Sequence, residues 1–190
     1  MDGPFLWYLN RGTGLVLLVL LTTSALLGIW ATRGDAGTRV PRFAVQALHR
    51  NLALLGVVLT ALHVTSAVAD TYVDIRWWQA FLPWRLAYQP WWLALGVIAL
   101  DLVVATVVTS LVRGRLPRRG WLVVHLGGYA ALVLSIAHGI GIGTDTGEGW
   151  ARWAYVGCGL ALVAAATARA TDARRRSSTA PRELDTVVAR

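Results

Sequence analysis

Five long apolar stretches, separated by shorter polar segments, dominate the chain. They lie near residues 12–32, 43–69, 91–112, 121–141 and 150–170. Each has the ~20 residues that a helix needs to cross about 30 Å of hydrocarbon. A span must be helical, because lipid offers no hydrogen-bond partner to backbone N–H and C=O groups. The pattern therefore predicts an all-α, polytopic membrane helix bundle with five transmembrane helices.

Composition supports this class of protein. The chain has 56% hydrophobic and 15% charged residues, with a mean hydropathy of +0.53, which excludes a disordered chain or a nucleic-acid-binding domain. The net charge of +8 comes from arginines clustered between apolar runs, as in multi-pass membrane proteins. The single cysteine, Cys158, excludes a disulfide framework and a thiolate-ligated metal.

Arginine placement predicts the orientation in the cell membrane. Basic clusters follow the first, third and fifth spans: Arg33, Arg39 and Arg42; Arg113, Arg115, Arg118 and Arg119; Arg174, Arg175 and Arg176. Basic connections stay in the cytoplasm, so we expect the N-terminus outside and the C-terminus inside. Residues 1–170 then form one membrane domain in contact with lipid. We expect residues 171–190, which are basic and polar, to form a disordered cytoplasmic tail.

The only long connection, residues 70–90, predicts an interfacial segment. It contains Trp77, Trp78 and Trp84, and two more tryptophans, Trp91 and Trp92, follow it. Because tryptophan concentrates at the membrane–water boundary, we expect this segment to lie on the outer leaflet.

All four histidines of the chain lie within two of the spans. His49 and His63 belong to the second span, and His125 and His138 belong to the fourth. An ionisable side chain within a span indicates a functional site. The alternative for any single histidine is a neutral imidazole that hydrogen-bonds a neighbouring helix.

The vertical spacing groups the histidines into two pairs. Both spans run outward, so His49 and His125 lie near the inner boundary, while His63 and His138 lie near the outer one. The intervals of 14 and 13 residues correspond to roughly 20 Å, too far for one zinc or di-iron centre. Two haems, each held by one histidine from each helix, fit this spacing.

The segments LHRNLALLGVVLTALH (48–63) and VHLGGYAALVLSIAH (124–138), with their two histidine intervals, resemble the ferric reductase-like transmembrane domain. This family includes ferric reductases, NADPH oxidases and the haem subunit of methionine sulfoxide reductase systems. The resemblance implies two b-type haems and an oxidoreductase component. His49 and His125 would ligate the iron of an inner haem, and His63 and His138 the iron of an outer one.

The resemblance also implies electron transfer across the membrane, from the inner to the outer haem and on to an extracytoplasmic acceptor. The chain shows no flavin or nicotinamide module after residue 170 and no glycine-rich phosphate loop. We therefore expect a separate cytoplasmic donor protein or a quinol to supply the electrons.

Several polar residues are candidates for supporting roles. We expect haem propionates to pair with arginines, and Arg50 lies deepest among those near the inner pair; Arg11, Arg76 and Arg85 lie toward the outer one. Thr60, Ser66 and Ser135 are candidate partners for the non-ligating histidine nitrogens.

Asp101 lies mid-span, where we favour a structural hydrogen bond. The segment 139–149 is either a flexible turn or a floor for an acceptor near the outer haem.

Two alternatives remain open at the level of sequence. One is a quinol-fed haem anchor for a soluble reductase. The other is a haem-free structural or transport protein whose histidines only pack helices.

Overall fold

The computed structural model describes residues 4–32, 40–71, 73, 75–84, 86 and 88–179. Three arginines used above to argue orientation or a haem contact lie outside this range: Arg33, Arg39 and Arg85. Residues 180–190 of the predicted tail also lie outside it.

The described part of the chain contains five long α-helices and no strand. They are α1 (Phe5–Thr32), α2 (Arg42–Ala69), α3 (Pro90–Leu111), α4 (Arg118–Ile142) and α5 (Gly149–Thr179), with short 3₁₀ turns η1 (Trp77–Ala80) and η2 (Arg113–Arg115). All five are long and apolar enough to cross a membrane. The prediction of an all-α bundle with five spans is confirmed.

Prolines mark the starts of three helices. Pro90 is the first residue of α3, and Pro41 and Pro117 precede α2 and α4. Proline suits these positions because its fixed φ matches the first turn and its missing N–H costs no helical hydrogen bond.

Two helix ends differ from the sequence prediction. α1 begins at Phe5, so Arg11 lies within the helix. α5 continues to Thr179, so the helix includes residues 171–179, which we had expected to belong to the tail. Ala173 and the three arginines at 174–176 are strong helix formers, and they let the helix continue past its apolar part.

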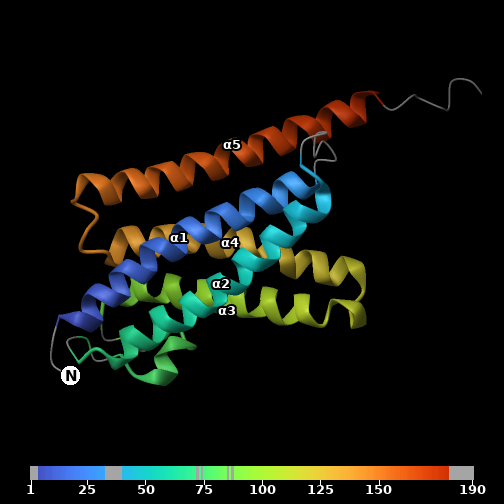
Figure 1. Ribbon diagram of the computed structural model, residues 1–190. Coiled ribbons are helices and arrows are strands. Elements are labelled where there is room, and N and C mark those ends of the chain that lie inside the picture. Colours follow the sequence, from blue (N-terminus) through green and yellow to red (C-terminus); the bar gives the residue numbers. More distant parts are fainter. Residues whose placement is uncertain are drawn as a thin grey trace, which may run out of the picture.

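Consecutive helices alternate in direction and form two hairpins (Figure 1). α1 packs along α2, α3 packs along α4, and α5 lies against α1 with a smaller contact to α4. α2 makes hardly any contact with α3 or α4. A small core joins the hairpins to α5 through Leu18, Leu132 and Cys158.

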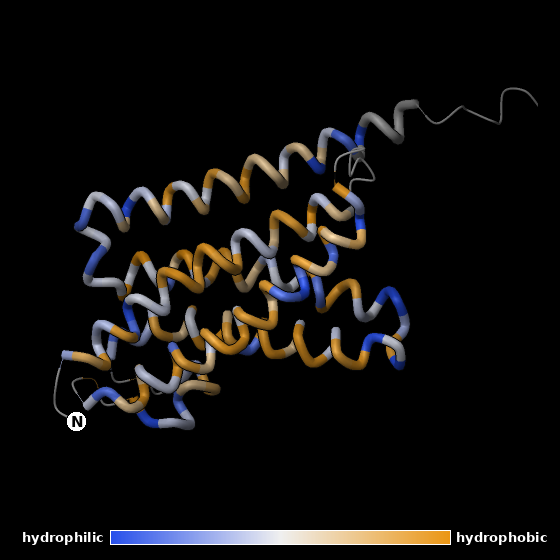
Figure 2. Tube along the Cα trace, viewed as in Figure 1, coloured by the Kyte–Doolittle hydropathy of each residue, from blue (hydrophilic) through white to orange (hydrophobic). Residues whose placement is uncertain are grey.

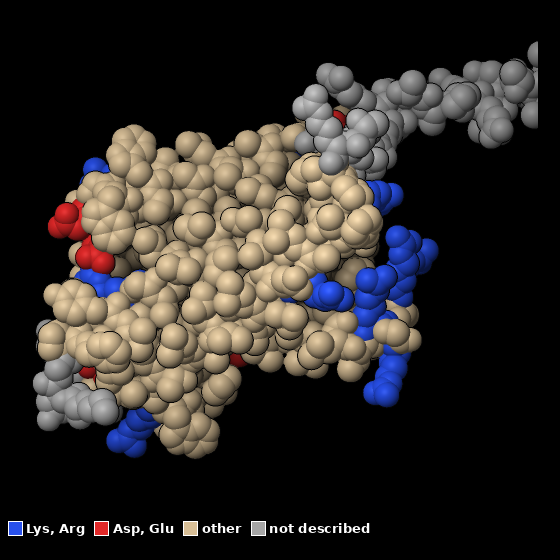
Figure 3. Space-filling view, in the orientation of Figure 1, with Lys and Arg blue, Asp and Glu red and all other residues tan. Residues whose placement is uncertain are grey.

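The outer surface has the character of a protein in lipid. Apolar residues cover much of the length of α1–α4, and polar residues gather toward the ends (Figure 2). Large apolar side chains stay exposed, such as Val58 and Leu160, each 64% exposed. On the face shown in Figure 3, basic side chains crowd one end of the bundle and the largest acidic patch lies at the other.

The connection between α2 and α3 folds back onto one end of the bundle. Gln79, Ala80 and Leu86 are buried there, whereas Trp77 and Trp84 remain exposed. An exposed tryptophan pair beside buried neighbours is the arrangement expected of a segment at a membrane boundary.

Candidate functional site

The fold brings the four histidines together as two pairs. Consecutive helices alternate in direction, so α2 and α4 run in the same direction (Figure 1). His49 and His125 therefore lie at the end of the bundle that carries the arginines of η2 and early α4. His63 and His138 lie at the opposite end, near the connection between α2 and α3.

The ring of His49 on α2 lies close to the ring of His125 on α4. Their centroids are 6.2 Å apart, with an angle of 75° between the ring planes. A metal–nitrogen bond is about 2 Å long, so two imidazole rings at this separation leave room for one metal ion between them.

His63 and His138 line one cavity of about 570 Å³. Its walls come from α1, α2, α3 and α4, together with the connection after α2 and the start of α5. Most of the lining is apolar, with a few polar groups that include Asn10, Arg11 and Asp145. Cavities of this size and character hold cofactors.

Three of the four histidines use Nδ1 to reach a backbone carbonyl of a neighbouring helix. His49 reaches the Ser24 carbonyl at 2.8 Å, His63 the Asn10 carbonyl at 3.0 Å, and His138 the Trp92 carbonyl at 2.8 Å. A donated Nδ1–H fixes the ring orientation and the tautomer. Nε2 then carries the free lone pair that a metal requires.

His125 is held differently. Its nearest Nδ1 partner is the hydroxyl oxygen of Ser110, at 3.5 Å. The Trp121 indole stacks on the His125 ring, with centroids 4.8 Å apart and planes at 24°, and its Nε1–H donates to the same Ser110 hydroxyl at 3.4 Å. The Arg113 guanidinium lies over the Trp121 ring, with Cζ 4.7 Å from the ring centroid. Aromatic packing here replaces the short carbonyl bond.

A glycine lies against each of the three carbonyl-bound histidines. Gly14 lies against His63, Gly28 against His49 and Gly96 against His138. A Cβ at Gly96 would lie only 2.6 Å from His138 Nδ1, and one at Gly14 would lie 3.0 Å from His63 Cε1. The absence of side chains at these glycines permits the close approach of imidazole and helix.

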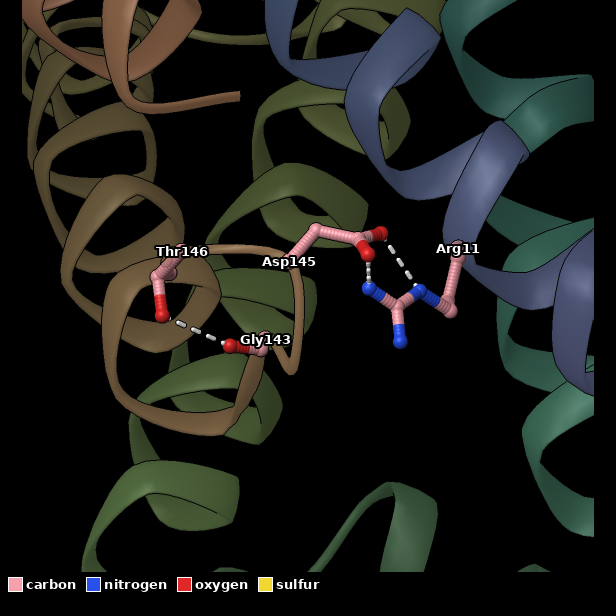
Figure 4. A network of polar contacts seen from close by, with 4 residues as sticks. All are labelled: Arg11, Gly143, Asp145 and Thr146. Atoms are coloured by element: carbon pink, nitrogen blue, oxygen red, sulfur yellow. Dashed lines mark hydrogen bonds and ion pairs between the residues drawn. The ribbon is translucent and has the colours of Figure 1, made fainter. Parts of the chain in front are cut away.

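The cavity also contains an ion pair that ties α1 to the segment before α5. Arg11 binds both carboxylate oxygens of Asp145 (Figure 4). The guanidinium also lies 4.1 Å from the centre of the Trp7 ring. Bidentate pairing and the aromatic contact hold a positive group at the edge of the cavity.

Other predicted supporting residues fall into different places. Arg50 is exposed on α2, and no hydrogen bond or ion pair to it is found among the described residues. Asp101 is also exposed and has no bonded partner within the described chain, so the predicted structural hydrogen bond is not seen there. In the segment 139–149, residues up to Ile142 belong to α4, while Thr144 and Asp145 line the cavity.

Two of the hydroxyl groups predicted to support the histidines do not bond an imidazole. Thr60 donates to the Gly56 carbonyl and Ser66 to the His63 carbonyl, both within α2. Hydroxyls on the histidines' own helix prefer such local carbonyls, so the partners come from α1 and α3. A sequence signal exists: Gly14 and Gly28 repeat the 14-residue interval of His49 and His63.

Each pair of histidines offers two imidazole nitrogens, which suits a metal whose remaining ligands come from a cofactor. The described residues contain no group of three or more His, Cys, Asp or Glu side chains that could hold a metal, so a metal bound by protein ligands alone has no site among them. Two facing imidazoles are enough for haem iron, whose other four ligands are porphyrin nitrogens. The molecule is thus a multi-pass helical membrane protein with paired intramembrane histidines.

The comparison with family models agrees with this class. The model described as ferric reductase like transmembrane component matches residues 13–136, and the chain belongs to this family. The match includes His49, His63 and His125 and ends two residues before His138. No curated protein and no solved structure matches the chain. Membership suggests electron transfer within a membrane, and domains of this family generally bind haem.

Proposed function

We propose that the chain binds two b-type haems and carries electrons across the cell membrane. His49 and His125 would hold one haem, and His63 and His138 the other. The observation that carries the proposal is the geometry of the His49–His125 pair: two rings 6.2 Å apart, each with Nδ1 turned toward another helix. The cavity shared by His63 and His138 supports the second site.

The haems, when bound, supply reversible one-electron redox chemistry. The positions of the histidines along the helices set the spacing of the two sites. The 14 residues between His49 and His63 separate them by roughly 21 Å along α2. The mostly apolar lining of the cavity limits water at the His63–His138 site. The short Nδ1 bonds of His49, His63 and His138 would leave the Nε2 atom of each ring free for iron.

The arginines give the proposed direction of transfer. We place the end of the bundle with Arg113, Arg115, Arg118 and Arg119 in the cytoplasm, so His49 and His125 hold the inner haem. A separate donor protein or a quinol would reduce this haem. We propose Arg50 as a partner of the propionates of the inner haem. Arg11 lines the cavity of His63 and His138, and we propose it as a partner of the propionates of the outer haem. The outer haem would pass electrons to an extracytoplasmic acceptor.

Absorption spectra of the purified full-length chain test the proposal. We expect a Soret band, an α-band after dithionite reduction, and about two haems per chain. His49→Ala and His125→Ala should each remove the same haem, and His63→Ala and His138→Ala the other. Replacement of the exposed Val163, distant from both pairs in sequence, with alanine is the matched control and should leave the haem content unchanged.

A protein without a Soret band would contradict the proposal and favour a haem-free structural or transport role. Loss of one common haem from His49→Ala and His138→Ala would contradict the pairing. A quinol-fed anchor of a soluble reductase keeps both haems and is distinguished by reduction with quinol in liposomes, where a cytoplasmic donor protein would be unnecessary.

A further inference from the structure

The three carbonyl acceptors share a position relative to the nearby glycines. Asn10 precedes Gly14, Ser24 precedes Gly28 and Trp92 precedes Gly96, each by four residues. A helical side chain covers the turn that precedes it, so the residue at i+4 lies over the carbonyl of residue i. Glycine at i+4 leaves that carbonyl open to a second donor from outside the helix.

The fourth position of this pattern is Ser110. It follows Gly96 by 14 residues, the same interval that separates Gly14 from Gly28. The carbonyl four residues before it belongs to Thr106, and there the Thr109 hydroxyl donates to it at 3.3 Å. His125 instead meets the Ser110 hydroxyl at 3.5 Å. A serine thus stands where the other three histidines have a glycine.

We infer that Ser110 is a positioning residue. It leaves Nδ1 of His125 without a short hydrogen bond, and the reduction potential of the haem held by His125 therefore differs from that of the haem held by His63 and His138. This inference rests on the proposed function. A strong acceptor on Nδ1–H makes the imidazole a stronger donor to the metal. Stronger donation stabilises ferric over ferrous iron and lowers the potential. The long contact to Ser110 therefore leaves the His49–His125 haem with a higher potential than a carbonyl acceptor would.

Redox titration of the full-length protein tests the inference. Ser110→Gly uncovers the Thr106 carbonyl, and we expect the midpoint potential of the haem held by His125 to become more negative.

Two controls separate this effect from a change in packing. Ser110→Ala removes the hydroxyl but keeps the carbonyl covered, so its midpoint should not move in the negative direction. Val163→Ala changes an exposed residue of α5 and should leave both midpoint potentials unchanged. An unchanged or more positive midpoint in Ser110→Gly would overturn the inference, as would equal shifts in Ser110→Gly and Ser110→Ala.

A measurement without haem keeps the two proposals distinguishable. In the haem-free protein labelled with ¹⁵N-histidine, Ser110→Gly should move the Nδ1 resonance of His125 alone toward that of the carbonyl-bound histidines. A wild-type chain that binds no haem would refute the proposed function, while this resonance would still test the hydrogen bond. An unmoved resonance would refute the role of Ser110 even in a haem-binding protein.

Discussion

The lack of a side chain at Gly96 allows the His138 ring to reach the backbone of α3. The His138 ring lies so close to α3 that any β-carbon at residue 96 would displace it from the Trp92 carbonyl. The imidazole would then lose the bond that fixes its tautomer and the direction of Nε2.

Gly96→Ala should therefore cost the protein one haem. We expect the haem content to fall from about two per chain to about one, with the loss confined to the His63–His138 site. Haem quantification by reduced-minus-oxidised difference spectra measures this. Gly157→Ala is the matched control, since a Cβ there meets nothing within 4 Å and should change neither haem. A Gly96→Ala protein with both haems would show that the close approach is unimportant.

Residue-scale predictions from sequence were of unequal quality. Depth along a helix follows from a fixed rise per residue. In the structure the rings of His49 and His125 lie 6.2 Å apart, and His63 and His138 line one cavity. The acceptors on α1 and α3 could not be chosen from the histidines' own segments, because they depend on which helix lies alongside. Thr60 and Ser66 were wrong choices for this reason.

At the scale of elements, the two hairpins leave a gap that α2 and α4 do not close by direct packing. Arg11 on α1 and Asp145 before α5 both line the cavity of His63 and His138 and form an ion pair there (Figure 4). Their side chains are 16% and 36% exposed, so water screens the pair only in part. We attribute to this pair the placement of the start of α5 over the cavity.

Breaking the pair should loosen that end of the bundle. Arg11→Ala should destabilise the protein by roughly 1–3 kcal/mol, because it leaves a carboxylate without its charged partner. Asp145→Asn should have a smaller effect, since the amide still accepts from Arg11. Apparent melting temperatures, measured at one heating rate, report the change.

A double-mutant cycle isolates the interaction. The double variant Arg11→Ala/Asp145→Ala should be more stable than the two single effects predict, with a coupling of at least about 0.5 kcal/mol. Strictly additive effects would mean that the contact contributes nothing. Arg152→Ala on the early part of α5 serves as a control for the loss of a cation at the same end.

For the whole molecule, unequal charge at the two ends predicts how the bundle lies in the membrane. The end with η2 and the start of α4 is strongly basic, and the opposite end carries the acidic residues near α5 (Figure 3). Basic connections remain in the cytoplasm because translocating them is unfavourable.

Cysteine labelling tests this orientation. In a Cys158→Ser background, Glu148→Cys should react with a membrane-impermeant maleimide on intact spheroplasts. Arg115→Cys should react only after the membrane is permeabilised. Both positions are exposed, so accessibility within the protein does not distinguish them. The reverse labelling pattern would invert the bundle and exchange the inner and outer haem sites.

The sequence by itself determined the number of spans, their approximate ends and the heights of the four histidines. These features follow from hydrophobic length and from the constant rise of a helix, both of which are local. Only the tertiary structure decided which groups meet sideways: the carbonyls of Asn10, Ser24 and Trp92, the Trp121 stack on His125, and the bridge from Arg11 to Asp145. Lateral contacts depend on the rotation and pairing of whole helices, which are set by the packing of all of them together.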